Sequence, residues 1–479
     1  MPFPRARADA KKMLTKEHIT ELKQDKNGEL AALAGRHGDG KDALFILQNL
    51  GRLPRDFDAG WVVALLSSKN KNIRLWAAKT LGKTGAADYL EALQNVMRAD
   101  DSTEVRREAV SSIGRMRDAN AIDSLVDMLN DNDPKIVCQA IRGLLVFKRD
   151  ARVGKALRPL ARHENEMVRQ IIEKEFGARK TSSANEQPHP VSWDFLKNVV
   201  VLGDVLEVLK RVPDESFHLT FTSPPYYNAR DYSIYPSYQA YLDFLEKVFR
   251  MTHQKTKAGR FLIVNTSPII IPRISRQHAS KRYPIPFDLH HFLARMGWDF
   301  IDDIVWVKPE SSVKNRNAGF LQHRKPLGYK PNARTEYLMV YRKHTEKLLD
   351  WNIRQYDFRT VSESKVGDGY ETSNVWEIDP THDRVHSAVF PVELCRRVIE
   401  YYSYKGDLVF DPFGGSGTFG RTAKSLERFF FLTEKDSTYF EYMQTFQKKG
   451  ASFLGQETRF LSTQQFKRHA SHGADKNHA

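Results

Sequence analysis

The sequence predicts an α-solenoid of stacked helix pairs followed by an α/β domain with a mostly parallel sheet. Three observations indicate this architecture: an apolar pattern that recurs at intervals of 31 or 32 residues in the first part, apolar runs that alternate with amphipathic stretches in the second part, and a polar stretch between them. The length of 479 residues supports more than one domain, because single cores stop growing beyond roughly 250–300 residues.

Composition and charge narrow the class of protein. Hydrophobic residues make up 41% and charged residues 28%, which is a globular composition. The net charge is +15, and residues 1–180 and 181–479 are both basic, so we expect a polyanionic partner such as nucleic acid. No apolar run approaches the roughly 20 residues of a membrane helix, and residues 1–10 lack the apolar stretch of a signal peptide, so we expect a cytoplasmic protein with no membrane partner.

Cysteine and histidine usage argues against two further classes. The chain has two cysteines, Cys138 and Cys395, which are too few for a disulfide framework or a cysteine zinc site. His382 and His386 stand four residues apart, but no third ligand is close to them in the sequence, so we expect no metal site.

The repeating pattern begins each time with an apolar anchor. The anchors are Ile73, Val105, Ile136 and Val168, and apolar residues follow each anchor four and eight positions later. Residues with this spacing form one stripe along a helix, and a second, shorter stripe follows in each unit. Each unit is therefore a helix pair whose apolar face needs a neighbouring pair to cover it. A weaker copy at 42–51 is a candidate capping unit.

These units resemble the short form of HEAT repeats over residues 29–177. The resemblance implies a right-handed stack with a curved surface that contacts DNA or another protein, or that serves only as support. We expect residues 1–28 to form a basic N-terminal segment before this stack. The polar residues 178–192, which are rich in Ser and Pro near their start and end, are predicted to be a linker.

Apolar runs and helical stretches alternate after the linker. The predicted strands are Val199–Leu202, His218–Thr222, Phe261–Asn265, Asp303–Val307, Tyr337–Tyr341, Leu408–Asp411 and Phe429–Thr433. Amphipathic helices are predicted at Tyr238–Arg250 and Pro286–Met296. Ligands bind at the carboxyl ends of parallel strands in such domains, so candidate functional residues are expected directly after strands.

A glycine loop follows one predicted strand. Residues 408–418 read LVFDPFGGSGT, in which a strand of the buried type leads to Asp411, then to glycines, then to a helix near Phe419. Glycines let backbone amides approach a ligand closely, and an Asp at a strand end accepts hydrogen bonds from amino or hydroxyl groups. The next strand ends at Glu434, 23 residues after Asp411, and an acid at this interval suits the hydroxyls of a ribose. The pattern indicates a nucleoside cofactor.

A rigid turn follows another predicted strand. Residues 222–226 read TSPPY, and the two prolines fix the backbone and remove two amide donors, so that mainly hydrogen-bond acceptors remain. Such acceptors suit the amine of a base, and the ring of Tyr226 is available for stacking. Acceptors that draw the two N–H groups out of the ring plane would free the nitrogen lone pair for attack on an electrophile.

The two motifs together, TSPPY and then DPFGGSGT, resemble those of the amino-methyltransferases that modify DNA. Their order, with the catalytic motif before the cofactor loop, is that of the permuted β class. The resemblance covers roughly residues 193–450 and implies a Rossmann-like methyltransferase domain at 193–455. We expect residues 456–479 to form a polar tail.

The resemblance also implies roles for individual residues. The catalytic corner would consist of Ser223, Pro224, Pro225 and Tyr226, with Ser223 and the Pro224 carbonyl holding the target amine of a base that leaves the duplex. The pocket for S-adenosyl-L-methionine would be lined by Asp204, Phe390, Pro391, Leu394, Asp411, Pro412, Phe413, Gly415, Ser416, Gly417, Thr418 and Glu434.

The identity of the first motif residue bears on the target base. In the family that this chain resembles, Ser at the position of Ser223 is associated with the N4 amine of cytosine and Asp with the N6 amine of adenine. We therefore expect a site-specific DNA (cytosine-N4) methyltransferase that is the modification component of a restriction-modification system. Two alternatives stay open: an N6-adenine enzyme of the same fold, and a HEAT-repeat DNA-binding scaffold with an inactive methyltransferase domain.

Partners and target recognition follow from this interpretation. The expected partners are double-stranded DNA and, through the HEAT-like array, a cognate restriction endonuclease or another protein. Residues 309–373 are the candidate target-recognition region, because the irregular basic stretch 308–334 carries Arg, Lys, Asn and Gln side chains suited to phosphates and base edges. Methylation at carbon 5 of cytosine is not expected, because it needs a thiolate and both Cys138 and Cys395 lie in predicted helices.

Overall fold

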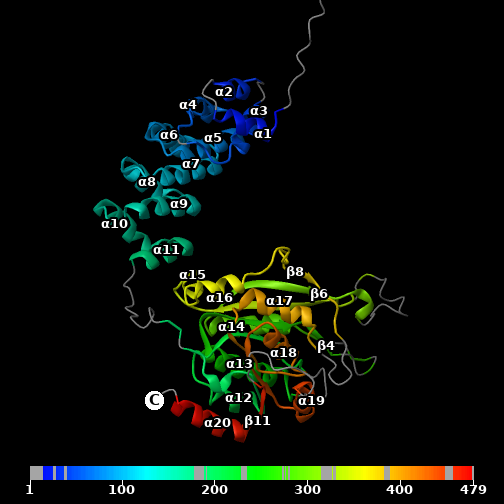
Figure 1. The fold of residues 1–479 in the computed structure, drawn as a ribbon. Helices are drawn as coiled ribbons and strands as arrows, with labels where there is room; N and C mark the ends of the chain where they lie inside the picture. Colours follow the sequence, from blue (N-terminus) through cyan, green and yellow to red (C-terminus); the bar gives the residue numbers. More distant parts are fainter. Residues whose placement is uncertain are drawn as a thin grey trace, which may run out of the picture. The chain divides into compact units, whose positions relative to one another are not determined.

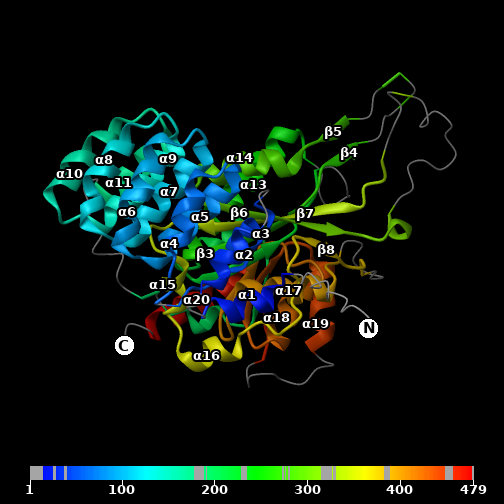
Figure 2. The same ribbon diagram turned by 90° about the horizontal axis from the view of Figure 1, so that it is seen from above.

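The computed structural model describes residues 14–24, 28–36, 40–54, 56–176, 188–189, 191–227, 235–271, 275, 277–278, 281–313, 326, 331–381, 389–447 and 457–476. The chain divides into two compact units, Met1–Ser183 and Ala184–Ala479, and Figures 1 and 2 show the elements of each unit from two directions. None of the helices in these ranges is both long and apolar enough to cross a membrane.

Helices in two rows make up the first unit (Figure 1). The first-helix row contains α3 (Lys41–Asn49), α5 (Lys71–Thr84), α7 (Thr103–Met116), α9 (Pro134–Leu144) and α11 (Glu166–Phe176). The second-helix row contains α4 (Gly60–Val63), α6 (Leu90–Ala99), α8 (Ile122–Asp127) and α10 (Ala151–Leu157). Two short helices, α1 (Lys16–Leu22) and α2 (Glu29–Ala34), precede both rows.

The periodic apolar residues form the core of this unit. All four anchors are buried, as are the residues four positions after them. In the first-helix row α5 packs against α7, and α7 packs against α9. A Cβ atom on Gly82 would stand 2.3 Å from the Ser112 Cβ, and one on Gly114 would stand 3.0 Å from the Gly143 Cα. The small residues therefore let neighbouring helices approach closely, and the predicted stack of helix pairs is confirmed.

The start of the helical stack differs from the prediction. Ile19 of α1 is fully buried, and α1 packs against α2 and α3. The described part of residues 1–28 therefore belongs to the stack and is not a separate basic segment. The sequence does not show that α1 packs in the stack, because Ile19 and Leu22 are the only apolar residues of this short helix.

The described residues of the second unit form a nine-stranded sheet in the order β11-β1-β10-β9-β2-β3-β7-β6-β8. The strands are β1 (Val199–Leu202), β2 (Phe217–Thr222), β3 (Thr256–Thr266), β6 (Trp298–Val307), β7 (Thr335–Lys343), β8 (Val375–Glu377), β9 (Leu408–Asp411), β10 (Phe429–Glu434) and β11 (Arg459–Ser462). The strands from β11 to β3 run parallel, whereas β7 is antiparallel to both of its neighbours. A separate hairpin contains β4 (Ile269–Ile271) and β5 (Lys281–Tyr283).

Helices cover both faces of this sheet (Figures 1 and 2). One face carries α17 (Val392–Tyr402), α18 (Thr418–Ser425) and α19 (Ser437–Gln447), and the other carries α12 (Val205–Leu209), α13 (Tyr238–Lys255), α14 (Ile285–Arg295) and α20 (Thr463–Lys476). Successive strand residues alternate between the two cores: Val200 packs with the first set of helices, and Val199 and Val201 pack with the second. The predicted α/β class with a mostly parallel sheet is confirmed.

The seven predicted strands are all present. Strands β1 and β9 have the predicted bounds, and the other five are longer than predicted. Strands β8 and β11 were not predicted, because they contain only three and four residues and pair at the two ends of the sheet. An edge strand has one neighbour and needs no continuous apolar run.

The described residues 457–476 do not form the polar tail that composition suggests for residues 456–479. Strand β11 pairs in parallel with β1, and the side chain of Phe466 in α20 is fully buried against the sheet. The Thr463 hydroxyl donates to the Leu202 carbonyl (2.9 Å), which ties the start of α20 to the end of β1. The sequence analysis missed this helix because its composition is polar. Among its described side chains only Phe466 and Ala470 are buried.

Candidate active site

The two sequence motifs meet at the carboxyl ends of neighbouring strands. Strands β2 and β9 pair in parallel, with Leu219 opposite Val409 and Thr220 opposite Phe410. The residues that follow are therefore side by side, although they lie 189 positions apart in the chain. A hydrogen bond joins them: the Thr222 hydroxyl donates to Asp411 Oδ1 at 2.7 Å. Both side chains are buried.

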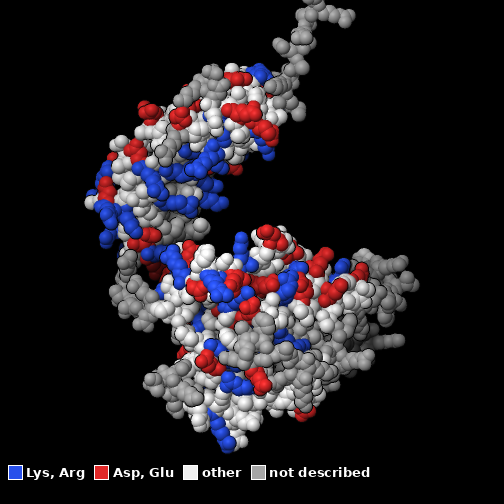
Figure 3. Space-filling view, viewed as in Figure 1, with Lys and Arg blue, Asp and Glu red and all other residues white. Residues whose placement is uncertain are grey.

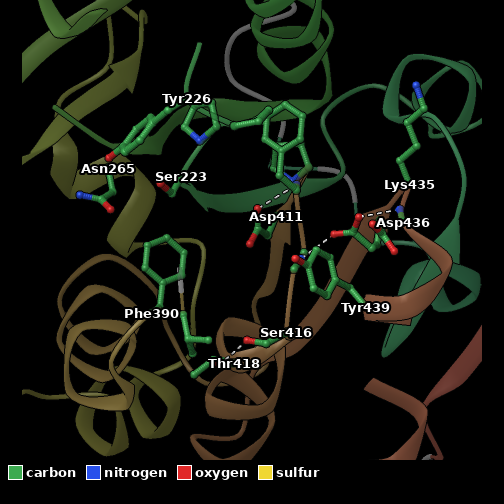
Figure 4. Close-up of a pocket in the computed structure, with 18 of the residues that line it drawn as sticks. Ser223, Tyr226, Asn265, Phe390, Asp411, Ser416, Thr418, Lys435, Asp436 and Tyr439 are labelled. Carbon is green, nitrogen blue, oxygen red and sulfur yellow. Dashed lines mark hydrogen bonds between the residues drawn. The ribbon is translucent and has the colours of Figure 1, made fainter. Parts of the chain in front are cut away.

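A cavity of about 870 Å³ opens at this edge of the sheet. Figure 4 shows Ser223, Tyr226 and Asn265 toward one end of the cavity and Asp436 and Tyr439 toward the other, with Asp411 between them. The predicted site residues that line the cavity are Asp204, Ser223, Pro224, Pro225, Tyr226, Phe390, Asp411, Pro412, Phe413, Gly415, Ser416, Thr418 and Glu434. The fold thus gathers most of both predicted sets into one space.

Three predicted residues do not line the cavity. Pro391 caps the N-terminus of α17, and Leu394 on the same helix is fully buried in the core beneath the sheet. Gly417 caps the N-terminus of α18 with a φ of 73°. A Cβ atom there would stand 2.7 Å from the Met443 sulfur. These residues shape the walls of the site and do not face its interior.

The rigid turn is anchored by its tyrosine. The Tyr226 hydroxyl donates to Glu336 Oε2 at 3.2 Å, and the same carboxylate forms an ion pair with the Lys308 ammonium. Burial, followed by repulsion from the Glu336 charge, raises the pKa of Tyr226 well above its usual value, so the phenol keeps its proton. On the other side of the strand end, the Phe221 ring stacks on Phe390 with the ring centroids 4.5 Å apart.

Backbone hydrogen bonds fold the glycine loop tightly between β9 and α18. The Gly414 N–H donates to the Thr433 carbonyl, and the Gly417 N–H donates to the Gly414 carbonyl, both at 2.8 Å. Gly415 adopts a φ of 52°, a conformation that side chains disfavour. Its N–H donates to Glu434 Oε2 at 2.7 Å. The loop therefore lies against the carboxyl end of β10, where Glu434 stands.

Burial raises the pKa of two of the carboxyl groups that line the cavity, Asp411 and Glu434. It raises the pKa of Asp411 to about 7, against hydrogen bonds from the Thr222 hydroxyl and the Phe413 N–H that favour the ionised form. Burial also raises the pKa of Glu434, although the N–H groups of Gly415 and Asp436 favour its charged form. Both groups are suited to a ligand that brings positive charge or hydroxyl donors into the cavity.

Several cavity residues were missed by the sequence analysis. The additional lining residues include Asn265, Trp306, Lys308, Glu336, Lys435, Asp436 and Tyr439. Asn265 could have been predicted, because it is the polar residue that ends an apolar run. In the structure it is buried at the carboxyl end of β3. Lys308 and Glu336 become neighbours only through the antiparallel pairing of β6 with β7, and nothing in their spacing shows that contact.

The candidate target-recognition region is divided between different places. Residues 314–325 and 327–330 lie outside the described residues. Thr335–Lys343 form strand β7 within the sheet. Residues 344–364, with α15 (Leu349–Ile353) and α16 (Phe358–Glu363), pack at the amino ends of β3 and β9, where the Tyr356 hydroxyl donates to Asp407 at 2.6 Å. This part of the region is therefore at the opposite edge of the sheet from the cavity.

The two cysteines lie away from the cavity lining. Cys395 in α17 is fully buried, and burial raises the pKa of its thiol well above the usual value. Burial also raises the pKa of Cys138 in α9. No group of three or more metal-binding side chains occurs among the residues that the structure describes, and His382 and His386 lie outside them.

Family comparisons match both units of the chain. Residues 217–445 match the DNA methylase family. Residues 90–177 match HEAT repeats, and residues 73–98 match the PBS lyase HEAT-like repeat.

Curated relatives match the second unit. The Type II beta methyltransferase M.BslI of Bacillus sp. (strain NEB-606) is 28% identical over 228 residues, which are 46% of this chain and 24% of that protein. The Type II methyltransferase M.ScaI of Streptomyces caespitosus is 28% identical over 247 residues, which are 47% of this chain and 73% of that protein. The chain thus spans about a quarter of the length of the first relative and about three quarters of the second.

A solved structure is also similar to this unit. It is a putative DNA modification methylase from Thermus thermophilus, complexed with S-adenosyl-L-methionine. The two chains are 24% identical with a TM-score of 0.45, and the similarity covers 56% of this chain and 98% of the other.

Proposed function

We propose that this chain methylates DNA at an exocyclic amine of a base, because residues 217–445 match the DNA methylase family and follow an array of HEAT repeats. The methyl donor in this proposal is S-adenosyl-L-methionine, and the target is the N4 amine of cytosine in double-stranded DNA. The names of the curated relatives, which are Type II methyltransferases, support a role as the modification component of a restriction-modification system.

The observation that carries the proposal is the contact between Thr222 and Asp411. This hydrogen bond lies between the acceptor-lined turn and the glycine loop, so both motifs share one cavity. Transfer of a methyl group needs the donor and the acceptor nitrogen in one space with the reacting atoms roughly 3–3.5 Å apart. Two motifs at separate edges of the sheet would not support this chemistry.

The residues of the cavity fit the proposed donor. The buried Asp411 carboxyl, with its raised pKa, would be stabilised in its ionised form by the donor's cationic amino group. Each Glu434 oxygen accepts one backbone N–H and keeps lone-pair capacity for the hydroxyls of a ribose. The donor, when bound, would supply an electrophilic methyl group: a nitrogen–carbon bond would form as the carbon–sulfur bond breaks and the sulfur keeps the electron pair, and one amine proton would pass to solvent.

The turn prepares the amine for this step. The Ser223 hydroxyl and the Pro224 carbonyl are acceptors at the end of β2, and we assign them to the two N–H groups of the target amine. When these acceptors draw the two N–H groups out of the ring plane, the nitrogen lone pair is no longer delocalised into the ring. The lone pair is then available to attack the methyl group. The Tyr226 ring is fixed through its hydroxyl on Glu336 and would stack on the flipped base. This stacking offsets part of the cost of unpairing the base.

The choice of cytosine N4 rests on Ser223. This neutral side chain stands where an acidic one is associated with adenine N6 methylation in the family that the chain resembles. A hydroxyl both donates and accepts, so it can hold one amine N–H without adding a charge to the cavity. Adenine N6 methylation and DNA binding without methyl transfer are the outcomes that would contradict this choice.

The test is a methyl-transfer assay with radiolabelled donor and unmethylated genomic DNA. We expect label in DNA, and digestion to nucleosides should place it in N4-methylcytosine. Tyr226→Ala should lower kcat/KM by about 5- to 150-fold, the effect of roughly 1–3 kcal/mol of lost stacking, whereas Tyr226→Phe should lose less than about tenfold because the ring remains. Phe300→Ala is the matched control, because Phe300 is 46% exposed, lies near the start of β6 and does not line the cavity.

Each contrary result has a distinct meaning. Label in N6-methyladenine would overturn the cytosine assignment and keep the methyltransferase. An absence of label with every duplex tested would leave the scaffold alternative. Equal losses in Tyr226→Ala and Phe300→Ala would show that stacking at Tyr226 does not contribute.

A further inference from the structure

A stripe of cationic side chains crosses the first-helix row of the repeat array. We define the cationic stripe as Lys79 and Lys83 of α5, Arg115 of α7 and Arg142 of α9. Figure 3 shows Lys and Arg side chains gathered over α5, α7 and α9, on the inner side of the bend that the array makes in Figure 1. Lys83, Arg115 and Arg142 are exposed, and Lys79 is half-buried.

The repeat register places these charges on one face. Lys79 and Arg142 stand six positions after their anchors, and Lys83 and Arg115 stand ten positions after theirs. Positions four apart on a helix lie on the same side. The close approach of α5 to α7 and of α7 to α9, at Gly82 and Gly114, brings the charges of successive repeats together. The stripe is therefore a product of the array and not of a single helix.

The charges are close enough to repel one another. Partial burial and then the positive charges of Lys79 and Arg115 lower the pKa of Lys83, and the negative charge of Glu108 opposes this only in part. Arg115 has a carboxylate partner, since its guanidinium lies 2.7 Å from Glu108 Oε1. In the described part of the chain no carboxylate forms an ion pair with Lys79, Lys83 or Arg142.

The stripe cations without a carboxylate have weaker partners. The Lys83 ammonium donates to the Gly51 carbonyl (3.1 Å), the Lys79 ammonium lies over the Trp76 ring, and Arg142 donates to Gln139. The second-helix row contains both paired and unpaired cations. Arg152 of α10 pairs with Asp123 and Asp150, and Arg98 of α6 lies 3.7 Å from Asp127. Lys155 of α10 and Arg158 and Arg162 of the turn after it form no ion pair with a described carboxylate, but they lie on one helix and its turn, whereas the stripe runs across three adjacent helices.

We propose that the cationic stripe binds the phosphate backbone of duplex DNA. A row of cations, of which only Arg115 has a described carboxylate partner, costs repulsive energy in the free protein, and a polyanion relieves this repulsion. Three adjacent helices at interaxial distances of about 8–10 Å span roughly 16–20 Å, which is the length of about five or six base pairs at 3.4 Å each. The choice of DNA as the polyanion rests on the proposed function. Contacts of this kind add affinity without sequence preference.

The test compares two variants of the full chain with equal net charge. The stripe variant carries Lys79→Gln, Lys83→Gln, Arg115→Gln and Arg142→Gln. The matched control carries Arg98→Gln, Lys155→Gln, Arg158→Gln and Arg162→Gln, four exposed cations of α6, α10 and the turn that continues α10. Binding of a labelled duplex of about 30 base pairs is measured by fluorescence anisotropy over a series of salt concentrations, without methyl donor.

We expect the stripe variant to bind at least about tenfold more weakly at low salt. Its plot of log affinity against log salt should be shallower by about 2–4, because each phosphate contact contributes roughly 0.9 to that slope. The control variant should match the unaltered chain, and circular dichroism melting should show that both variants fold.

Two results would overturn the proposal. Equal weakening in both variants would assign the effect to net charge alone. Unchanged binding in the stripe variant would assign the surface to another partner, such as an acidic protein. Methyl transfer is assayed separately, so a chain that binds duplex through the stripe but transfers no methyl group would contradict the proposed function and leave the stripe proposal intact.

Discussion

Asp411, at the carboxyl end of β9, changes charge near neutral pH. Burial raises its pKa to about 7 in the folded chain, compared with an ordinary value of 3.8. Between these two pH values the folded chain holds a proton that the unfolded chain has lost. The contribution of this carboxyl to stability therefore decreases as the pH rises from about 4 to 7. The same titration should appear in ligand binding.

We predict that S-adenosyl-L-methionine binds more tightly as the pH rises from about 6 to 8. A group with a pKa of about 7 goes from about a tenth ionised to about nine tenths ionised over this range. If the carboxylate contacts the cationic donor, the affinity should increase by about tenfold, as measured by isothermal titration calorimetry. Asp411→Asn should bind weakly at both pH values, and Glu434→Gln should keep the pH dependence. A flat profile in the unaltered chain would contradict the contact.

The residue scale also shows where sequence reasoning stops. Ser223, Asp411 and Glu434 could be placed at the site because each ends or follows a recognisable apolar strand. Lys308 and Glu336 could not, since their contact depends on the pairing of β6 with β7. Leu394 shows the opposite error: its segment borders the site, but its side chain faces the core.

The elements of the repeat array are held at distances set by glycines. Gly82 of α5 is the strongest case, since a Cβ atom there would stand 2.7 Å from the backbone Cα of Ser112. Gly154 of α10 is also helical, but a Cβ atom at this position would meet no neighbouring atom within 4 Å. Alanine at Gly82 therefore measures the cost of a methyl group in a tight contact between helices. Alanine at Gly154 measures the gain in helix stability alone.

We predict opposite effects of alanine at these two glycines. Gly82→Ala should destabilise the array by about 1–3 kcal/mol, because α5 and α7 must move apart. Gly154→Ala should stabilise it by up to about 1 kcal/mol, because alanine is the better helix former. Thermal unfolding followed by circular dichroism gives both values. Equal stabilisation in the two variants would mean that α5 and α7 are not in close contact.

At the edge of the sheet, Phe466 tests the correction to the C-terminal boundary. Phe466→Ala should lower the free energy of unfolding by about 3–5 kcal/mol, as expected for a fully buried aromatic side chain. The matched control is Phe358→Ala, because Phe358 of α16 is 88% exposed. Chemical denaturation of the full chain should show a lower midpoint for the first variant alone. If neither variant changes the midpoint, residues 456–479 are a solvated tail as the sequence suggests.

The elements were predictable to the extent that their apolar pattern was complete. Strands β1 and β9 are buried between neighbours and have continuous apolar sequences, so their ends were predicted correctly. The helices α5, α7 and α9 were recognised because three or more repeats share one register. α1 and α20 each depend on two buried described residues, which is too few to mark a face in the sequence.

At the scale of the whole molecule, the chain has separate apolar cores. One cluster contains only residues of the first unit, and three clusters contain only residues of the second. We predict two transitions in differential scanning calorimetry. S-adenosyl-L-methionine at about 100 times its Kd should stabilise one transition by about 2.7 kcal/mol, and this should be the transition that Phe466→Ala lowers. A shift of the transition that Gly82→Ala lowers would contradict the assignment of the donor to the second unit.

The pairing of β1 with β11 has a consequence during synthesis. Val199 of β1 lies opposite Arg459 of β11. Strand β1 therefore lacks this neighbour until the ribosome has added a further 260 residues. At about 5–20 residues per second this interval lasts roughly 13–52 s. The described helices of the repeat array pack within a repeat or against an adjacent repeat, so the array can fold on the nascent chain during this interval. The residues that line the cavity have all been added once Tyr439 is made, but the sheet is completed only when β11 pairs with β1.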